Sequence, residues 1–321
     1  MNHSLLVVVI ASGVTYGTPL LYAALGELLA ERSGVLNLGV EGMMLVGAVM
    51  GFWAVQRFHP DTALSLAAGI GVAALAGALM ASIHAFLVIT LRASQIVSGL
   101  ALTILAGVAG LSSYLGNDLN LADQPAVHQF NPVFPASLRD WPVVGPIVFN
   151  QNVLVYASWV LVAVLIWYLN RTRLGLNVRA VGESPAAADA MGINVAAYRY
   201  GHTIAGGAFA GIAGATFTLA INPLWTAGIT GGAGWIAIAL VIFSFWRPEL
   251  CLVGAYFFGA LQALAPELQA RQISFGPTTL WTNSLPYLAT IAALVLISIG
   301  NARRRLGAPA ALGVPYTREE R

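Results

Sequence analysis

Long apolar runs separated by short polar segments dominate this chain. None of the runs has the alternating polarity of a barrel strand, so only helices would satisfy their backbone groups in lipid. We therefore expect an all-α polytopic membrane protein with about nine transmembrane helices. The runs occupy residues 5–25, 43–55, 62–91, 94–115, 153–169, 203–221, 235–245, 251–264 and 285–299.

Two of these runs are too short to cross a bilayer. As helices, residues 43–55 would rise about 20 Å and residues 235–245 less, against roughly 30 Å of hydrocarbon. Each follows a glycine-rich polar stretch, SGVLNLGVEG at residues 33–42 and TAGITGGAG at residues 226–234. We expect two broken helices whose irregular portions line a protected cavity at membrane depth. Surface loops followed by short or tilted helices are the alternative.

Small residues recur at four-residue spacing within two of the longer runs. Such rows let helix backbones approach closely in lipid, and they predict a tightly packed bundle. The rows are Gly69, Ala73, Gly77 and Ala81 in one run, and Gly207 and Gly211 in another.

A polar island at residues 170–199 lies between two apolar runs. Ser184 can cap a helix with its hydroxyl, Pro185 suits the first helical position, and Gly192 can adopt a left-handed terminating conformation. The pattern predicts one short helix over residues 183–193, which would suit a docking element. An ordinary solvated loop is the alternative.

The arginines indicate the orientation in the membrane. Positive residues mark the cytoplasmic side, and they cluster at Arg171, Arg173, Arg179 and Arg199 and again at Arg303, Arg304 and Arg305. Residues 117–151 are acidic on balance and read as extracytoplasmic. We therefore expect one transmembrane domain over residues 1–300, with a cytoplasmic loop at 170–199, a cytoplasmic tail at 301–321 and the N-terminus outside.

Composition narrows the class further. The chain is 58% hydrophobic and 9% charged, whereas about a quarter of the residues of a soluble domain would be charged. All 15 of its basic Lys and Arg residues are arginine. Without a lysine it cannot use a P-loop to hydrolyse ATP, so any ATP-driven motor must be a separate subunit. A net charge of +2, spread over the ends of the apolar runs, gives no case for nucleic-acid binding.

Catalytic and metal-binding patterns are missing from the sequence. The single cysteine, Cys251, excludes an internal disulfide and a cysteine-rich metal site. The five histidines form no H-E-x-x-H pair, and no serine lies in a G-x-S-x-G turn. We expect no enzyme, no catalytic residue and no metal. His84, inside an apolar run, is either a helix-packing histidine or a proton relay.

Several polar or aromatic residues in or beside the two expected breaks are candidates for a substrate pathway. A carboxylate at membrane depth is expensive, which makes Glu41 a functional candidate. Amides and hydroxyls can bind a neutral polar solute, and tryptophans can stack on a sugar face or a base. An interfacial tryptophan belt and asparagines that satisfy loop backbones are the alternatives. The candidates are Asn37, Glu41, Asn222, Trp225, Thr226, Thr230 and Trp235.

Three segments resemble one family of transporters. ERSGVLNLGVEGMMLVGA at residues 31–48 is similar to the nucleoside and simple-sugar permease branch of ABC importers, a branch related to the ribose and branched-chain amino acid permeases. TGGAGWIAIALVIFSFWRP at residues 230–248 and RTRLGLNVRAVGESPAAADAMGI at residues 171–193 extend the resemblance in the same order and spacing. The sequences of these segments resemble the nucleoside members more closely than the ribose members.

The resemblance implies a permease subunit of a bacterial inner-membrane importer for nucleosides. Its partners would be a second permease in a heterodimer, two cytoplasmic ATPases that bind ATP-Mg, and an extracytoplasmic solute-binding protein; this chain would bind no cofactor. The contact to the ATPase carries over to Glu183, Ser184, Ala187, Asp189 and Gly192. The alternatives are a simple sugar as the solute, or a secondary transporter driven by an ion gradient, for which intramembrane charge is sparse.

Overall fold

The computed structural model describes residues 4–58, 62–107, 109–272, 284–292, 295 and 307–317. Across these ranges the chain is helical without strands, apart from one isolated bridge between Pro132 and Asn152, which confirms the all-α prediction. The α-helices are α1 (Leu5–Arg32), α2 (Val40–Arg57), α3 (Ala63–Ala85), α4 (Gln95–Ala106), α5 (Leu111–Asp118), α6 (Ala136–Arg139), α7 (Val153–Arg171), α8 (Arg173–Glu183), α9 (Pro185–Ala190), α10 (Val195–Thr216), α11 (Ala233–Phe243) and α12 (Pro248–Ala270). Residues 284–292 are also helical. Short π turns occupy Phe86–Thr90, Gly145–Phe149 and Phe217–Ile221, and a 3-10 turn occupies Leu121–Asp123.

Several of these helices have the length and hydropathy of membrane spans. Within the described ranges there are 6 such segments: Leu5–Arg32, Ala63–Thr90, Gln95–Asp118, Val153–Arg171, Val195–Ile221 and Pro248–Ala270. α11 is apolar but shorter. The last expected run, residues 285–299, lies partly outside the described residues.

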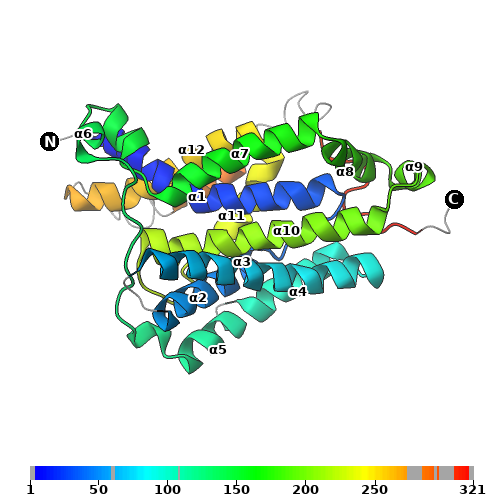
Figure 1. Cartoon of the computed structure of the whole chain (residues 1–321), viewed down its shortest axis with the longest axis horizontal. Helices are drawn as coiled ribbons and strands as arrows, with labels where there is room; N and C mark the ends of the chain where they lie inside the picture. Colours follow the sequence, from blue (N-terminus) through cyan, green and yellow to red (C-terminus); the bar gives the residue numbers. More distant parts are fainter. Residues whose placement is uncertain are drawn as a thin grey trace.

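The helices form one bundle with two clear ends (Figure 1). α1 and α10 lie side by side at its centre; α1 also packs against α11 and α12, and α10 against α2 and α3. α6 lies at one end, here called the α6 end, where α1 also begins. α8 and α9 lie at the opposite end, here called the α9 end. The segments predicted on opposite sides of the membrane, 117–151 and 170–199, therefore lie at opposite ends of the bundle.

Glycines allow the central helices to touch through their backbones. A Cβ added to Gly77 on α3 would lie 2.1 Å from the carbonyl oxygen of Gly207 on α10, and one added to Gly211 would lie 2.0 Å from the carbonyl oxygen of Ala73. The predicted rows of small residues thus face one another. Close backbone packing replaces the hydrophobic driving force that is absent between helices in lipid.

Two details of the helices were not expected from the sequence. The run at residues 94–115 is interrupted, because α4 ends at Ala106 and α5 begins at Leu111. Gly110, between them, has its Cα so close to the carbonyl of Leu105 that a Cβ would lie 2.1 Å from that oxygen. The polar island holds two helices, α8 and α9, where one helix over residues 183–193 was expected. α8 forms because Thr172 caps it at 3.0 Å from the Gly175 amide and because Val178 and Val181 are buried.

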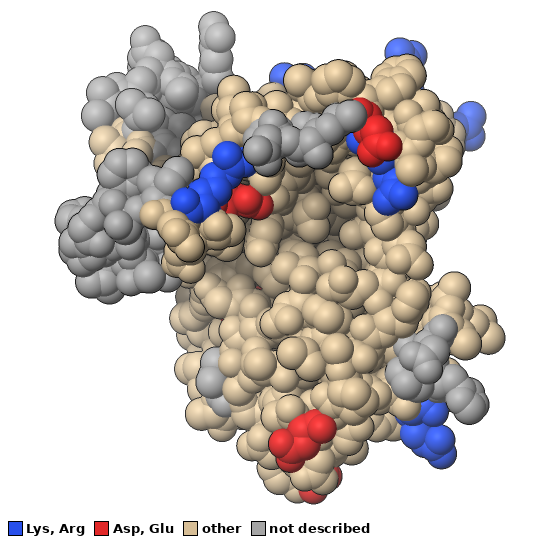
Figure 2. All heavy atoms as spheres, turned by 90° about the vertical axis from the view of Figure 1, so that its left-hand side faces the viewer, with Lys and Arg blue, Asp and Glu red and all other residues tan. Residues whose placement is uncertain are grey.

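The surface of the α6 end is largely uncharged. On the described part of this face, Figure 2 shows a few arginine and acidic side chains, some of them next to each other, within a surface of other residues. At the α9 end, by contrast, arginines follow one another through α7 and α8 at Arg171, Arg173 and Arg179.

Candidate functional site

The irregular segment between α1 and α2, residues 33–39, is mostly buried, and polar side chains satisfy its backbone. Glu27 on α1 accepts a hydrogen bond from the amide of Asn37 at 2.9 Å. Gln95 on α4 accepts one from the amide of Leu36 at 2.6 Å. Because a buried backbone group without a hydrogen-bond partner is costly, these side chains stabilise a non-helical segment here.

Two further helices hold the carbonyl groups of the same segment. The buried ring of His84 on α3 bonds the carbonyl oxygen of Leu36 at 3.1 Å and the hydroxyl of Ser98 on α4 at 2.9 Å. Thr103 on α4 donates to the carbonyl oxygen of Leu38 at 2.9 Å. Both ring nitrogens of His84 have neutral partners, which is the arrangement of a helix-packing histidine.

Asn37 points inward toward the start of α2. Its side-chain oxygen accepts a hydrogen bond from the amide of Gly39, the residue that precedes α2, at 3.0 Å. Its amide nitrogen lies 3.4 Å from the sulfur of Met43. Asn37 is 1% exposed, so its side chain organises the break from within.

Glu41 joins the two glycine-rich stretches of the sequence. From the first turn of α2, one carboxylate oxygen accepts hydrogen bonds from the hydroxyl of Thr230 at 2.5 Å and the amide of Gly232 at 3.0 Å. The other oxygen accepts from the amide of Gly234 at 2.7 Å. Gly232 precedes α11 with a φ of 83°, so the carboxylate lies at the positive N-terminus of α11.

The remaining pathway candidates lie in different environments. Trp225 is buried in a hydrophobic cluster with Phe52 and Leu121. Its ring lies so close to Gly116 on α5 that a Cβ there would be 2.0 Å from Cη2 of the indole. Asn222, Thr226 and Trp235 are exposed. The structure thus brings Glu41 and Thr230 together and gives Trp225 a packing role.

Sequence reasoning missed the side chains that hold the breaks. Gln95, Ser98 and Thr103 lie within an apolar run at spacings that place them on one face of α4, which was the available signal. Tyr287, whose hydroxyl donates to the carbonyl oxygen of Gly231 at 2.7 Å, offered no comparable pattern. Glu27 was visible only as an acidic residue near the end of a span.

α8 and α9 form an arm at the α9 end. Ser184 accepts a hydrogen bond from the Ala187 amide at 3.4 Å, Pro185 occupies the first turn of α9, and Gly192 has a φ of 82°. These observations confirm the predicted start and end signals for a helix bounded by Pro185–Ala190. Val181, Ala188 and Val195 form a small core that fixes the arm on α10.

The arm presents a small apolar tip to its surroundings. Ala187 is exposed, and Met191, directly after α9, is 82% exposed. Glu183, Ser184 and Gly192 are also exposed, and Asp189 is half-buried. Met191 was not among the predicted contact residues, although a fully exposed methionine is unusual and suits an adaptable contact surface.

The C-terminal residues 307–317, here called the strap, cross the α9 end and tie three elements together. The amide of Ala311 donates to the carbonyl oxygen of Gly182 on α8 at 2.9 Å. The amide of Gly313 donates to the carbonyl oxygen of Gly34 in the first break at 3.3 Å. Arg199 on α10 is 2% exposed and donates to the carbonyl oxygen of Val314 at 3.1 Å. The strap therefore connects the arm to the first break.

Comparison with known proteins gives a consistent family. The family described as branched-chain amino acid transport system, permease component, matches residues 9–297. A putative glucose ABC transporter permease of Haloferax volcanii is 42% identical over 95% of this chain and 96% of its own length. A guanosine ABC transporter permease of Bacillus subtilis is 35% identical over 99% of this chain and 98% of its own. A nucleoside ABC transporter permease of Lactococcus lactis is 34% identical over 98% of each chain. No solved structure matches the chain.

Proposed function

The chain belongs to the branched-chain amino acid transport system permease family, and on this premise we propose that it is the transmembrane subunit of an ATP-driven nucleoside importer. The observation that carries the proposal is near full-length identity of 34% and 35% to two permeases named for nucleoside and guanosine transport. The family match confirms the resemblance of the three sequence segments. A transport subunit needs no catalytic site of its own.

A simple sugar is the second candidate solute. The relative that is 42% identical is named a putative glucose permease. Nucleosides and sugars both present neutral hydroxyl groups, and both can stack on an aromatic ring. The exposed side chains of Asn222, Thr226 and Trp235 suit either solute.

The two irregular segments support the broken-helix interpretation. α2 starts at Val40 after the buried residues 33–39, and α11 starts at Ala233 after residues 222–232. If α2, α11 and the final run at 285–299 each form a pass, they add to the six long segments to give the expected count of about nine. We propose that the solute pathway runs beside these breaks, with the exposed Asn222, Thr226 and Trp235 facing the solute. The buried Asn37, Glu41, Trp225 and Thr230 support the pathway from behind.

The distribution of arginines supports a cytoplasmic α9 end. Among the described residues, the α9 end carries Arg32, Arg92, Arg171, Arg173, Arg179, Arg199 and Arg247, whereas the α6 end carries Arg57, Arg139 and Arg271. This bias follows the positive-inside rule. The N-terminus would then lie outside a bacterial inner membrane, and residues 301–321 inside.

The arm is the proposed contact to the ATPase. Its exposed tip, from Glu183 through Ala187 to Met191, is a compact surface on the side where ATP is available. The strap gives that surface a hydrogen-bonded connection to the first break. Two separate ATPases with ATP-Mg, a second permease in a heterodimer and an extracytoplasmic binding protein complete the proposed importer, and this chain itself binds no cofactor.

Uptake in cells that carry the complete gene set tests both the driving force and the solute. We expect labelled nucleoside to enter, excess unlabelled nucleoside to compete, and glucose to compete weakly. Depleting ATP should stop uptake, whereas collapsing the proton gradient at constant ATP should leave the uptake rate unchanged. Uptake that depends on the proton gradient and not on ATP would show that the protein is a secondary transporter. Stronger competition by glucose than by nucleoside would show that the solute is a sugar.

A further inference from the structure

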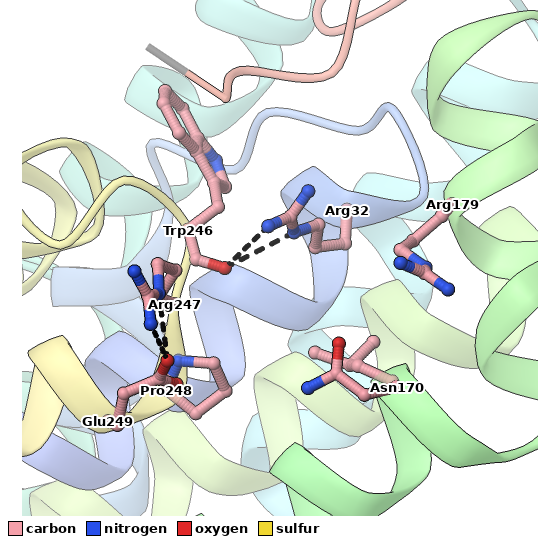
Figure 3. Close-up of a pocket in the computed structure, with 8 residues that line it drawn as sticks. Arg32, Asn170, Arg179, Trp246, Arg247, Pro248 and Glu249 are labelled. Atoms are coloured by element: carbon pink, nitrogen blue, oxygen red, sulfur yellow. Dashed lines mark hydrogen bonds and ion pairs between the residues drawn. The ribbon is translucent and has the colours of Figure 1, made fainter. Parts of the chain in front are cut away.

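A pocket with a volume of about 210 Å³ opens at the α9 end between α1, α7, α8 and α12. Its polar lining comes from Arg32, Asn170, Arg179, Arg247 and Glu249 (Figure 3). The guanidinium of Arg32 points toward Trp246, Arg179 lies on the other side of Arg32 from Trp246, and Asn170 lies below them. From the sequence, Arg179 was expected only to mark the cytoplasmic side, and Arg32 and Arg247 were given no role.

The charges in this pocket do not balance. Arg247 is paired with Glu249 at 2.5 Å, so those two side chains neutralise each other. Arg32 is held by the carbonyl oxygen of Trp246, at 3.2 Å from Nε and 2.8 Å from Nη2, which fixes its direction without cancelling its charge. Arg179 has no hydrogen bond or ion pair with any described residue, and its Nε is buried without a partner. The pocket lining therefore holds three arginines against one carboxylate, that of Glu249, and Glu183 also acts electrostatically on Arg32.

A second, apolar groove lies further along α12, on the side that faces α11. It has a volume of about 280 Å³ and lies between α11 and α12. Glu249 lines the pocket, while Val253 and Phe257, one and two helical turns further along the same face of α12, line the groove. Val253 is 65% exposed and Phe257 is 56% exposed. α12 thus borders both spaces, the positive pocket at its first turn and the apolar groove over the turns that follow.

We propose that the pocket and the groove together bind one anionic phospholipid, with its phosphate in the pocket beside Arg32 and Arg179 and an acyl chain along Val253 and Phe257. Arginine is suited to phosphate oxygens because its planar guanidinium donates two hydrogen bonds at once. Asn170 can donate a further hydrogen bond from its amide. Basic pockets between spans on the cytoplasmic side recognise anionic head groups. The groove further along α12 offers an apolar surface for an acyl chain of the same molecule.

Lipid binding to the purified full-length chain in detergent tests this site without requiring transport. Native mass spectrometry and thermal unfolding would be recorded during titration with phosphatidylglycerol, phosphatidylcholine, glycerol phosphate or inorganic phosphate. We expect one phosphatidylglycerol per chain to be retained and to raise the unfolding temperature, with phosphatidylcholine binding at least fivefold more weakly. If inorganic phosphate or glycerol phosphate stabilised the chain as much as phosphatidylglycerol does, the lipid proposal would be wrong and the pocket would be a site for a free anion.

Matched variants locate the site. Arg179→Gln should weaken phosphatidylglycerol binding about fivefold, the loss expected for one arginine near an anionic head group. Arg173→Gln changes an exposed arginine on the same helix outside the pocket and should have no effect. Val253→Asn should weaken binding of phosphatidylglycerol. Its unfolding temperature in detergent without lipid should equal that of the control Val160→Asn, which changes an exposed valine on α7. Equal effects of Arg179→Gln and Arg173→Gln on phosphatidylglycerol binding would refute the proposal. It would also be refuted if a second copy of the chain, and not a lipid, covered Val253.

Discussion

The carboxylate of Glu41 accepts a hydrogen bond from the hydroxyl of Thr230 at 2.5 Å, although 189 positions separate them in the sequence. The amides of Gly232 and Gly234 donate to the same carboxylate. Three donors from the second glycine-rich stretch therefore converge on one residue of the first. The two irregular segments of the bundle are consequently fixed to each other at the N-termini of α2 and α11.

Replacing Glu41 should destabilise the protein. Glu41→Ala leaves two backbone amides and a hydroxyl without an acceptor, which should cost about 3 kcal/mol, and Glu41→Gln should cost less because its amide oxygen can still accept. Thermal unfolding of the purified chain in detergent measures the difference. Asp118→Ala, at the end of α5, serves as a carboxylate control that should leave stability unchanged.

The same variants distinguish a positioning role from direct solute contact. If Glu41 acts through the break, uptake by Glu41→Gln should fall in its maximal rate while the KM for solute stays near that of the wild type. A raised KM with unchanged thermal stability would instead show that the carboxylate contacts solute.

Close packing between α3 and α10 predicts opposite effects for two glycines on one helix. Gly77→Ala would place a Cβ 2.1 Å from the Gly207 carbonyl oxygen and should cost about 1–3 kcal/mol by forcing the helices apart. Gly71→Ala has no atom within 4 Å of its Cβ and should gain about 0.5–1 kcal/mol from helix propensity. Equal unfolding temperatures for the two variants would contradict this packing.

A bulky residue on the arm should uncouple ATP hydrolysis from transport. Ala187→Trp enlarges the exposed face of α9, so the ATPase should no longer seat on it. In the assembled importer, solute-stimulated ATP hydrolysis and uptake should both fall at least tenfold while the chain itself unfolds at its normal temperature. Ala136→Trp, an exposed alanine on α6 at the opposite end, should couple normally.

The strap should control how firmly the arm is held. Ala311→Pro removes the amide that donates to the carbonyl oxygen of Gly182 and should raise hydrogen exchange across α8 and α9. Ala308→Pro changes a strap residue to proline outside this hydrogen bond and should leave exchange near the wild-type rate. Unchanged protection of the arm in Ala311→Pro would mean that Val181, Ala188 and Val195 suffice to hold it.

Features with a local cause could be predicted from the sequence. Ser184, Pro185 and Gly192 set the ends of α9 through groups within a few residues of one another, and the glycine rows of α3 and α10 follow from helical spacing. The all-helical fold follows from the length of the apolar runs. In each case the physical cause lies inside one segment.

Features that depend on distant partners could not be predicted. The acceptors and donors that hold residues 33–39 come from Glu27, His84, Gln95 and Thr103, with Ser98 bonded to His84 behind them, and no local pattern pairs them with that segment. The strap likewise bonds Gly182, Gly34 and Arg199 from the far end of the chain. α8 was not predicted, because most of its residues are polar and the burial of Val178 and Val181 depends on contacts with other segments.

Uptake by proteoliposomes that contain this chain, a second permease, the ATPases and the solute-binding protein tests the central claim most directly. With ATP-Mg on the cytoplasmic face, labelled nucleoside should accumulate against its gradient, and a non-hydrolysable ATP analogue or Ala187→Trp should abolish accumulation. Accumulation without ATP, or ATP-dependent accumulation of glucose with no nucleoside transport, would contradict the account.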